Sequence, residues 1–326
     1  MKIAVAGAGH LGKIHLRCIQ QIPDWDLIGF YEINAQTRQQ VSQELNVPAW
    51  DNFEELLEAC DCLDIVTPTP YHFGLAQQAL LKGKHVFIEK PVCSTLEEAK
   101  QLLDLSFQTG LVVQVGHVER FNPAFLALEG QSLHPMFVEI HRLAPFNPRG
   151  TDVSVVLDLM IHDLDLLLHL VKSEVIEISA HGVAVVSKTP DICNARLVFA
   201  NGCTANLTAS RISLKAMRKL RFFQPHMYIS VDLLEKETQI VRLWNEHPGE
   251  GSGLVMPLET DDGEKYLQVV LPPVENNNAI VEELKSFLGA VKNGGPVKVT
   301  LEDGTEALDL AWKILAEAEK HDLPRR

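Results

Sequence analysis

The chain begins with MKIAVAGAGHLG, residues 1–12, and this stretch decides the fold of its first third. Gly7, Gly9 and Gly12 form a G-x-G-x-x-G pattern between a short strand, 2–6, and a helical stretch, 11–21. In this pattern the glycines allow a tight turn, a close approach of backbone to a pyrophosphate, and close packing of helix on strand. The amides at the helix N-terminus then face the phosphates. The stretch therefore predicts a dinucleotide-binding strand–turn–helix unit, the alternative being a glycine-rich turn without a ligand.

Glu32 supports this interpretation, because it ends the second expected strand 20 residues after Gly12. A carboxylate at this position accepts hydrogen bonds from both ribose hydroxyls and repels a 2′-phosphate, so it favours NAD over NADP. Arg38 follows six residues later and leaves NADP open.

The first third of the chain alternates strand-like and helical stretches. Thr95 and Glu98 have the spacing of a capping box, in which each side chain satisfies an amide at the start of a helix. Such alternation predicts βαβ units and a doubly wound parallel sheet of the Rossmann type, with helices on both faces. The further strands expected are 27–31, 62–67, 85–88 and 111–115, and the further helices are 35–45, 53–59, 71–82 and 95–109.

The pattern changes after Gly116. A long helical stretch, 153–171, precedes strand-like runs at short intervals over 176–270, which are joined by turn signals such as Asn201-Gly202 and Asp262-Gly263. Two helices, 275–292 and 305–320, follow. We expect an NAD-binding Rossmann domain over residues 1–117. Over 118–326 we expect an α+β domain with an open, mostly antiparallel sheet, which binds the substrate and forms oligomers.

Composition excludes several classes of protein. A net charge of −14 over 326 residues disfavours nucleic-acid binding, which needs a broad basic surface. The stretch 153–171 carries three aspartates and two histidines and is unsuited to a bilayer, and the N-terminus does not resemble a signal peptide. Only Cys60 and Cys62 among the six cysteines are near each other, which predicts reduced thiols, no structural metal and a cytoplasmic location.

Lys90 lies in the motif Glu89-Lys90-Pro91, directly after the strand 85–88. Ligands of open parallel sheets bind at the carboxyl ends of the strands. An amine there can hydrogen-bond an alcohol oxygen that loses its proton during oxidation. A solvated lysine at the start of a loop is the alternative. Pro91 is a candidate for a cis peptide bond.

A polar stripe on the helix 153–171 is the strongest chemical signal in the second half. If the helix is regular, four polar side chains fall within about 60° of one another, namely Asp158, His162, Asp165 and His169. The remaining positions are mostly apolar, and buried carboxylates and imidazoles are costly unless paired or used in chemistry. The pattern favours catalysis. A satisfied structural network and a metal site are the alternatives, although no second element supplies further metal ligands.

With these residues the chain resembles the glucose-fructose oxidoreductase / inositol dehydrogenase (Gfo/Idh/MocA) family over its whole length. The matching motifs are the glycine loop, TPTPYH at 67–72, EKP at 89–91, GHVERFNP at 116–123 and DLMIHDLD at 158–165. Where family members often have glycine in the last motif, this chain has Met160.

The resemblance implies which residues form the sites. It implies a catalytic group of Lys90, Asp158 and His162, which also contact the substrate together with Glu119, Arg120 and Asn122. Around the cofactor it implies the glycine loop with His10 and Leu11, then Glu32, Thr67, Pro68, His72, Glu89 and Lys90. It also implies a homodimer or homotetramer formed through the C-terminal sheet.

The substrate is suggested by two features. The segment GHVERFNPAF resembles that of family members acting on nucleotide sugars such as UDP-N-acetylglucosamine, and that of the MviM-like branch. Five cations without an acid occur between residues 211 and 221, and a diphosphate needs such partners. They are Arg211, Lys215, Arg218, Lys219 and Arg221, and Arg120, Arg142 and Arg149 lie near the other motifs. A solvated strand face is the alternative.

The sequence predicts an NAD-dependent oxidoreductase of the EC 1.1.1 class, acting on a secondary alcohol of a sugar. A UDP-N-acetylhexosamine oxidised at ring C3 is the expected substrate. One rival is an oxidoreductase acting on a free polyol or another small carbonyl or alcohol. The other is a non-enzymatic NAD(H)-binding regulator, which has no reason to keep Lys90, Asp158 and His162 together.

Overall fold

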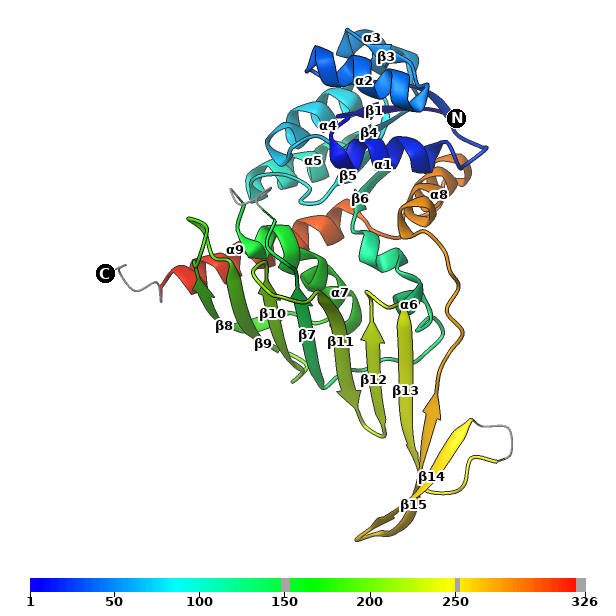
Figure 1. The fold of residues 1–326 in the computed structure, drawn as a ribbon, viewed down its shortest axis with the longest axis vertical. Helices are drawn as coiled ribbons and strands as arrows, with labels where there is room; N and C mark the ends of the chain where they lie inside the picture. The colour runs from blue at the N-terminus through cyan, green and yellow to red at the C-terminus, as the bar shows by residue number, and fades with distance from the viewer. Residues whose placement is uncertain (148–152, 250–252, 321–326) are drawn as a thin grey trace. The chain divides into compact units, whose positions relative to one another are not determined.

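The computed structural model describes residues 1–147, 153–249 and 253–320 (Figure 1). The chain divides into two compact units. Unit 1 contains Met1–Phe121 and Asn277–Asp309, and unit 2 contains Asn122–Asn276 and Leu310–Arg326.

Unit 1 is built on a six-stranded parallel sheet with the order β3-β2-β1-β4-β5-β6. This is the strand order of dinucleotide-binding Rossmann folds, and it confirms the predicted fold class. The strands β1, β4, β5 and β6 are buried along most of their length, as expected for a parallel sheet covered by helices. The strands are β1 (Lys2–Ala6), β2 (Asp26–Tyr31), β3 (Ala49–Trp50), β4 (Cys62–Ile65), β5 (His85–Glu89) and β6 (Val113–Gly116).

The helices between these strands lie close to their expected positions. The capping box of Thr95 and Glu98 is formed, and Gly110 ends the same helix in the left-handed conformation. The helices are α1 (His10–Ile19), α2 (Ala35–Leu45), α3 (Phe53–Ala59), α4 (His72–Leu81) and α5 (Leu96–Thr109), with short 3₁₀ turns at Thr69–Tyr71 and Val118–Phe121.

Unit 1 also includes α8 (Ala279–Asn293), which is distant in sequence. The side chains of Leu284 and Phe287 are fully buried in one core with Ile3 and Leu16. Unit 1 is therefore made of two separate stretches of the chain. The apolar face of α8 completes the Rossmann core, and only afterwards does α9 (Leu301–Glu319) lead into unit 2.

Unit 2 contains a nine-stranded sheet with the order β14-β15-β13-β12-β11-β7-β10-β9-β8. Every neighbouring pair is antiparallel except β7 and β10, so the predicted mostly antiparallel sheet is confirmed. Gly202 and Gly263 have positive φ in the turns that the sequence predicts. The strands are β7 (Phe137–Leu143), β8 (Val175–Val183), β9 (Ile192–Phe199), β10 (Thr204–Ser210), β11 (Met217–Gln224), β12 (Met227–Asp232), β13 (Glu237–Trp244), β14 (Leu254–Thr260) and β15 (Gly263–Val270).

One face of this sheet forms the core of unit 2. Buried side chains of alternate strand positions pack with Leu164 and Leu167 of α7 (Ile161–Val171), which runs along the sheet in Figure 1. The short helix α6 (Pro123–Leu126) adds Ala124 and Phe125 to this core. The other face of the sheet carries the alternating polar positions, which is the pattern of an antiparallel sheet covered on one side.

The helix expected over 153–171 is not regular. Residues Val156–Met160 form a π-helical turn, and the α-helix begins only at Ile161. The constant rotation per residue that placed Asp158 on one stripe with His162 therefore does not apply to this turn. None of the helices in the described part of the chain is long and apolar enough to span a membrane.

Candidate functional site

The glycine loop of unit 1 has the geometry that a dinucleotide needs. Gly7 has φ of +97°, and a Cβ on it would lie 2.8 Å from the carbonyl oxygen of Val66. A Cβ on Gly12 would lie 2.2 Å from the carbonyl oxygen of Gly7, so helix and loop pack in direct contact. Around Gly9 there is open space, and this residue begins α1 without a side chain that could cap it. The loop fits a pyrophosphate at Gly9, with the α1 amides facing it.

Glu32 is held against this loop. Its Oε2 accepts a hydrogen bond from the Ala8 amide at 3.0 Å, and its Oε1 accepts one from the Asn34 amide at 3.0 Å. The guanidinium of Arg38 donates to the backbone oxygen of Glu32 at 2.8 Å and lies 2.6 Å from Asp51. Arg38, the residue that left NADP open in the sequence, is thus already paired with the Asp51 carboxylate, while the Glu32 carboxylate lies at the glycine loop.

His72 links the ends of two neighbouring strands. Its Nε2 lies 2.8 Å from the carbonyl oxygen of Thr67 after β4, and its Nδ1 lies 2.9 Å from that of Pro91 after β5. The ring is 1% exposed. Burial lowers the pKa of His72, against the opposing effect of the two carbonyls. Both ring nitrogens of His72 contact backbone oxygens, so we expect His72 to support the loops around Thr67 and Pro68. A direct contact of His72 with the cofactor stays a prediction.

The motif at residues 89–91 lies where β5 ends. The Lys90–Pro91 peptide bond is cis, as the sequence suggested. The Glu89 carboxylate is 7% exposed, and its Oε2 accepts a hydrogen bond from the Lys90 amide at 3.1 Å. The side chain of Lys90 is partly exposed. His10 and Leu11, at the start of α1, are exposed.

Beneath this motif is a buried cluster that sequence reasoning missed. His15 of α1 contacts Asp64 of β4 and Glu89 of β5, and Glu283 of α8 lies beside them. One signal was available, because Asp64 interrupts an otherwise apolar buried strand, CLDI. The position of Glu283 had no local signal, because its partners come from the other end of the chain.

The segment 117–122 is buried. Glu119 is 4% exposed and Arg120 is 2% exposed, and Arg120 lies 3.6 Å from Asp303 in unit 1. Asn122, in unit 2, caps α6 by accepting a hydrogen bond from the Ala124 amide at 3.1 Å, and it donates to the carbonyl of Leu233 at 2.9 Å. Arg120 and Asn122 thus have structural contacts of their own. Contact of Glu119, Arg120 and Asn122 with the substrate remains a prediction.

Asp158 and His162 lie at the start of the helical segment in unit 2. Asp158 is in the π-helical turn, and His162 is in the first turn of α7. Both are partly exposed, whereas Asp163 and Asp165 are buried and His169 is exposed. Irregular π turns are frequent at functional sites, which agrees with the chemical interpretation of Asp158. Lys90 belongs to unit 1, whereas Asp158 and His162 belong to unit 2.

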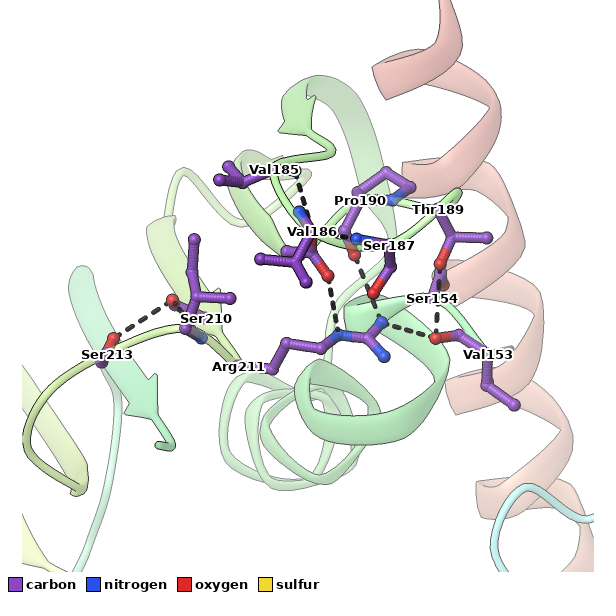
Figure 2. Close-up of polar contacts among 12 residues, drawn as sticks. Val153, Ser154, Val185, Val186, Ser187, Thr189, Pro190, Ser210, Arg211 and Ser213 are labelled. Carbon is purple, nitrogen blue, oxygen red and sulfur yellow. Dashed lines mark hydrogen bonds and ion pairs between the residues drawn. The ribbon is translucent and has the colours of Figure 1, made fainter. Parts of the chain in front are cut away.

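The basic run does not form one cluster. Arg211 is 5% exposed and its guanidinium donates to the backbone oxygens of Val153 and Pro190, as Figure 2 shows. It also lies 3.6 Å from Asp191. Hydrogen bonds from Ser187 and the neighbouring amides outweigh the effect of burial and lower the pKa of Asp191 to about 2. Arg211 is therefore a structural residue that fixes the chain just before the π-helical turn.

The other cations of the run are divided between the two faces of β11. Leu220 is buried against the helices, so Lys219 and Arg221 lie on the opposite, open face of the sheet. Lys219 lies 3.3 Å from Asp232 and Arg221 lies 2.7 Å from Glu139. Arg218 shares the helix-side face with Leu220, and Lys215 is exposed in the preceding loop. Arg149 lies outside the described residues.

Fold and loop together define an NAD-binding oxidoreductase with a Rossmann cofactor domain. The profile of the oxidoreductase family with an NAD-binding Rossmann fold (GFO_IDH_MocA) matches residues 1–117, and that of the GFO/IDH/MocA C-terminal domain matches residues 131–227. The chain belongs to the Gfo/Idh/MocA family of oxidoreductases, as the motifs predicted. It is an NAD-dependent dehydrogenase of the class that acts on CH–OH groups.

Individual relatives cover nearly the whole chain. UDP-N-acetylglucosamine 3-dehydrogenase of Acidithiobacillus ferrooxidans is 36% identical over 298 residues, which are 91% of this chain and 90% of that protein. A solved structure of that dehydrogenase, GnnA, superposes with a TM-score of 0.88 at 33% identity and 98% coverage of both chains. Myo-inositol 2-dehydrogenase of Thermotoga maritima is 27% identical over 331 residues, which are 96% of this chain and 94% of that protein.

Proposed function

We propose that the chain oxidises the C3 hydroxyl of UDP-N-acetylglucosamine, or of a close UDP-N-acetylhexosamine, to the ketone. The observation that carries this proposal is the 36% identity to a UDP-N-acetylglucosamine 3-dehydrogenase over 91% of the chain. The GHVERFNPAF segment, which resembles that of nucleotide-sugar members of the family, supports it independently of any single contact.

The cofactor supplies the hydride acceptor, NAD⁺, and the chain supplies binding and proton chemistry. Gly7, Gly9 and Gly12 with the α1 amides would hold the pyrophosphate, and Glu32 would accept the ribose hydroxyls. Thr67, Pro68 and the backbone near Glu89 would border the rest of the cofactor.

Three residues carry the proposed chemistry. His162 accepts the proton of the sugar hydroxyl as general base. Lys90 donates a hydrogen bond to the same oxygen and stabilises its developing negative charge. Asp158 orients one of these two groups. Glu119, Arg120 and Asn122 would shape the substrate site, in part by ordering the backbone of their segment.

The diphosphate of such a substrate needs cationic partners, and the structure narrows the choice. Arg211 is buried among backbone oxygens, and Lys219 and Arg221 lie on the open face of the sheet. Of the described cations in β11, Arg218 is on the face shared with the helices and is the better candidate.

The proposal is tested by following NADH formation with UDP-N-acetylglucosamine, N-acetylglucosamine and myo-inositol. Two charge-assisted contacts to the diphosphate, at about 1.5–3 kcal/mol each, would make kcat/KM for the nucleotide sugar roughly two to four decades higher than for the free sugar. Arg218→Ala should lower kcat/KM for the nucleotide sugar, and Lys219→Ala, on the opposite face, is the matched control. Equal turnover of the free sugar would remove the nucleotide-sugar assignment.

A free polyol is the second candidate, favoured by the near-full-length similarity to the myo-inositol 2-dehydrogenase. It predicts turnover of myo-inositol with no dependence on Arg218.

We further propose a cytoplasmic homodimer or homotetramer formed through the open face of the nine-stranded sheet, which light scattering of the purified protein would test.

A further inference from the structure

Four titratable side chains meet in the interior of unit 1, below the Lys90 backbone. The Nδ1 of His15 lies 2.9 Å from Oδ2 of Asp64, and its Nε2 lies 3.1 Å from Oε1 of Glu89. A carboxylate oxygen of Glu283 lies within 4.8 Å of the His15 and Glu89 atoms. The side chains of His15, Asp64 and Glu283 have no exposed surface, and neither the glycine loop nor the proposed proton chemistry uses any of them.

The contacts determine where the protons are. Nδ1 of His15 is in hydrogen-bond contact with Asp64 and Nε2 lies within ion-pair distance of Glu89, an arrangement that favours the imidazolium. Burial alone would lower the pKa of His15, but Asp64 and Glu89 outweigh it and hold that pKa well above the ordinary value. Both oxygens of Glu283 have no hydrogen-bond partner among the described residues. Burial and the nearby Glu89 raise the pKa of Glu283, so it is buried as the neutral acid.

The cluster connects to Lys90 through one residue. While Oε1 of Glu89 is held by His15, its Oε2 accepts the backbone amide of Lys90 at 3.1 Å. The space for this carboxylate is set by Gly116 on the neighbouring strand, because a Cβ there would lie 2.8 Å from Oε1 of Glu89. The Glu89 carboxylate is thus fixed from three directions, by His15, by the Lys90 amide and by the Gly116 backbone.

We propose that His15 is a positioning residue: its imidazolium, oriented by Asp64, holds Glu89 so that the Glu89 carboxylate fixes the backbone at Lys90 and thereby the Lys90 amine. The inference rests on the proposed function of Lys90 for its catalytic consequence. Its structural half, the link from His15 to the Lys90 amide, does not depend on the substrate.

A bound metal ion is the competing explanation for the same cluster. His15, Glu89 and Glu283 are ligand types that divalent cations accept, and a ligating histidine often donates its second nitrogen to a carboxylate, as His15 does to Asp64. The 3.1 Å separation of Nε2 of His15 and Oε1 of Glu89 is that of an ion pair, but Nε2 makes no hydrogen bond within the described part of the chain. Metal content is therefore a decisive measurement.

The structural half is tested by NMR of protein labelled with ¹⁵N-lysine, with the Lys90 amide assigned from Lys90→Arg. In His15→Gln a neutral side chain reaches only one of the two carboxylates, so the Lys90 amide proton should move upfield as its hydrogen bond weakens. Gly116→Ala, which presses on Glu89 without changing a charge, should move the same resonance. His134→Gln, an exposed histidine of unit 2, is the control. A Lys90 amide that stays in place in both variants overturns the inference, whatever the substrate is.

The catalytic half is tested by kcat per bound NADH, which separates poor positioning from loss of folded protein. His15→Gln should lower kcat per NADH site by about 10- to 100-fold with the KM for NAD⁺ unchanged, since a misplacement of about 1 Å can cost on the order of 100-fold. A variant that binds fewer NADH molecules but keeps kcat per site would show a merely structural role and overturn the proposal. If the wild type oxidises no sugar, the proposed function fails separately, and the amide resonance still decides the structural link.

Elemental analysis of the purified wild type completes the test. We expect no stoichiometric transition metal. If the wild type holds one metal per chain and Glu283→Gln loses it, the cluster is a metal site and not a set of protonated side chains. That result would overturn the inference.

Discussion

The guanidinium of Arg142 and the carboxylate of Asp163 form a buried ion pair that joins β7 to α7. Both Nε and an Nη of Arg142 donate to Oδ1 of Asp163, at 2.9 and 2.8 Å. The two side chains are 4% and 2% exposed. The pair fixes the residue that directly follows His162, so it connects β7, an inner strand of the nine-stranded sheet, to the helix that carries the proposed general base.

Removing one partner of this pair should destabilise the protein strongly. Arg142→Met removes the guanidinium that donates twice to the buried Asp163 carboxylate, and loss of about 3–5 kcal/mol of unfolding free energy is expected. Urea unfolding measures it. The double variant Arg142→Met with Asp163→Leu removes both charges and should recover most of this loss. If the single and double variants were equally unstable, the cost would come from packing and not from the unpaired charge.

The sequence was a good guide where local rules decide the structure. The glycine loop, the capping box of Thr95 and the turns at Gly202 and Gly263 were all predictable, because each depends on a few neighbouring residues. Glu32 was placed correctly at the loop for the same reason. It follows β2, and β2 pairs with β1, the strand that leads to its hydrogen-bond partner Ala8.

Features that depend on distant partners were not predictable. The strand β7 was missed although the buried Val138, Ile140 and Arg142 alternate with partly exposed positions, because its neighbours β10 and β11 lie far along the chain. The π-helical turn at Val156–Met160 has no local signature. The basic run suggested one cationic patch, but alternate residues of a strand face opposite sides, and their acidic partners come from β7, β9 and β12 or the loops beside them.

Cofactor preference should follow Glu32. We expect NADH to bind more tightly than NADPH, because the proposed role of the Glu32 carboxylate is to accept the ribose hydroxyls, and its charge would repel a 2′-phosphate. Glu32→Ser should weaken NADH binding roughly 10- to 100-fold, the equivalent of one charge-assisted hydrogen bond. Quenching of tryptophan fluorescence measures both affinities.

The pairing of Arg38 with Asp51 supplies the matched variant. Asp51→Asn removes the carboxylate 2.6 Å from the guanidinium and should improve NADPH binding while leaving NADH binding unchanged. Tighter binding of NADPH by the wild type would mean that Arg38, and not Glu32, determines the preference.

Stability should fall on the alkaline side because of the buried cluster. His15 has a folded-state pKa above its ordinary value of 6.5, so its stabilising contribution is fully present below that pH and is lost as the pH rises through the folded pKa. Glu283 changes stability in the same direction as the pH rises, because its folded-state pKa lies above the ordinary value of 4.5. The lowered pKa of His72 acts oppositely, on the acid side.

Urea unfolding over a range of pH compares the wild type with His15→Gln. The decline toward high pH should be shallower in His15→Gln, because this variant has no imidazolium to lose. His134→Gln should follow the wild type. Parallel curves for wild type and His15→Gln would show that His15 is not protonated in the folded protein.

Lys90 and His162 should be required for turnover and not for cofactor binding. General acid–base groups contribute about 10²- to 10⁴-fold each, so Lys90→Met and His162→Ala should each lower kcat by that factor while NADH still binds. Lys82→Met and His134→Ala, both exposed positions away from the proposed chemistry, are the matched controls. The measurement is NADH formation with the sugar that the wild type oxidises, combined with NADH titration of each variant. Near-normal kcat in His162→Ala would show that His162 is not the general base. Asp158, in the π-helical turn one turn earlier, would then be the next residue to substitute.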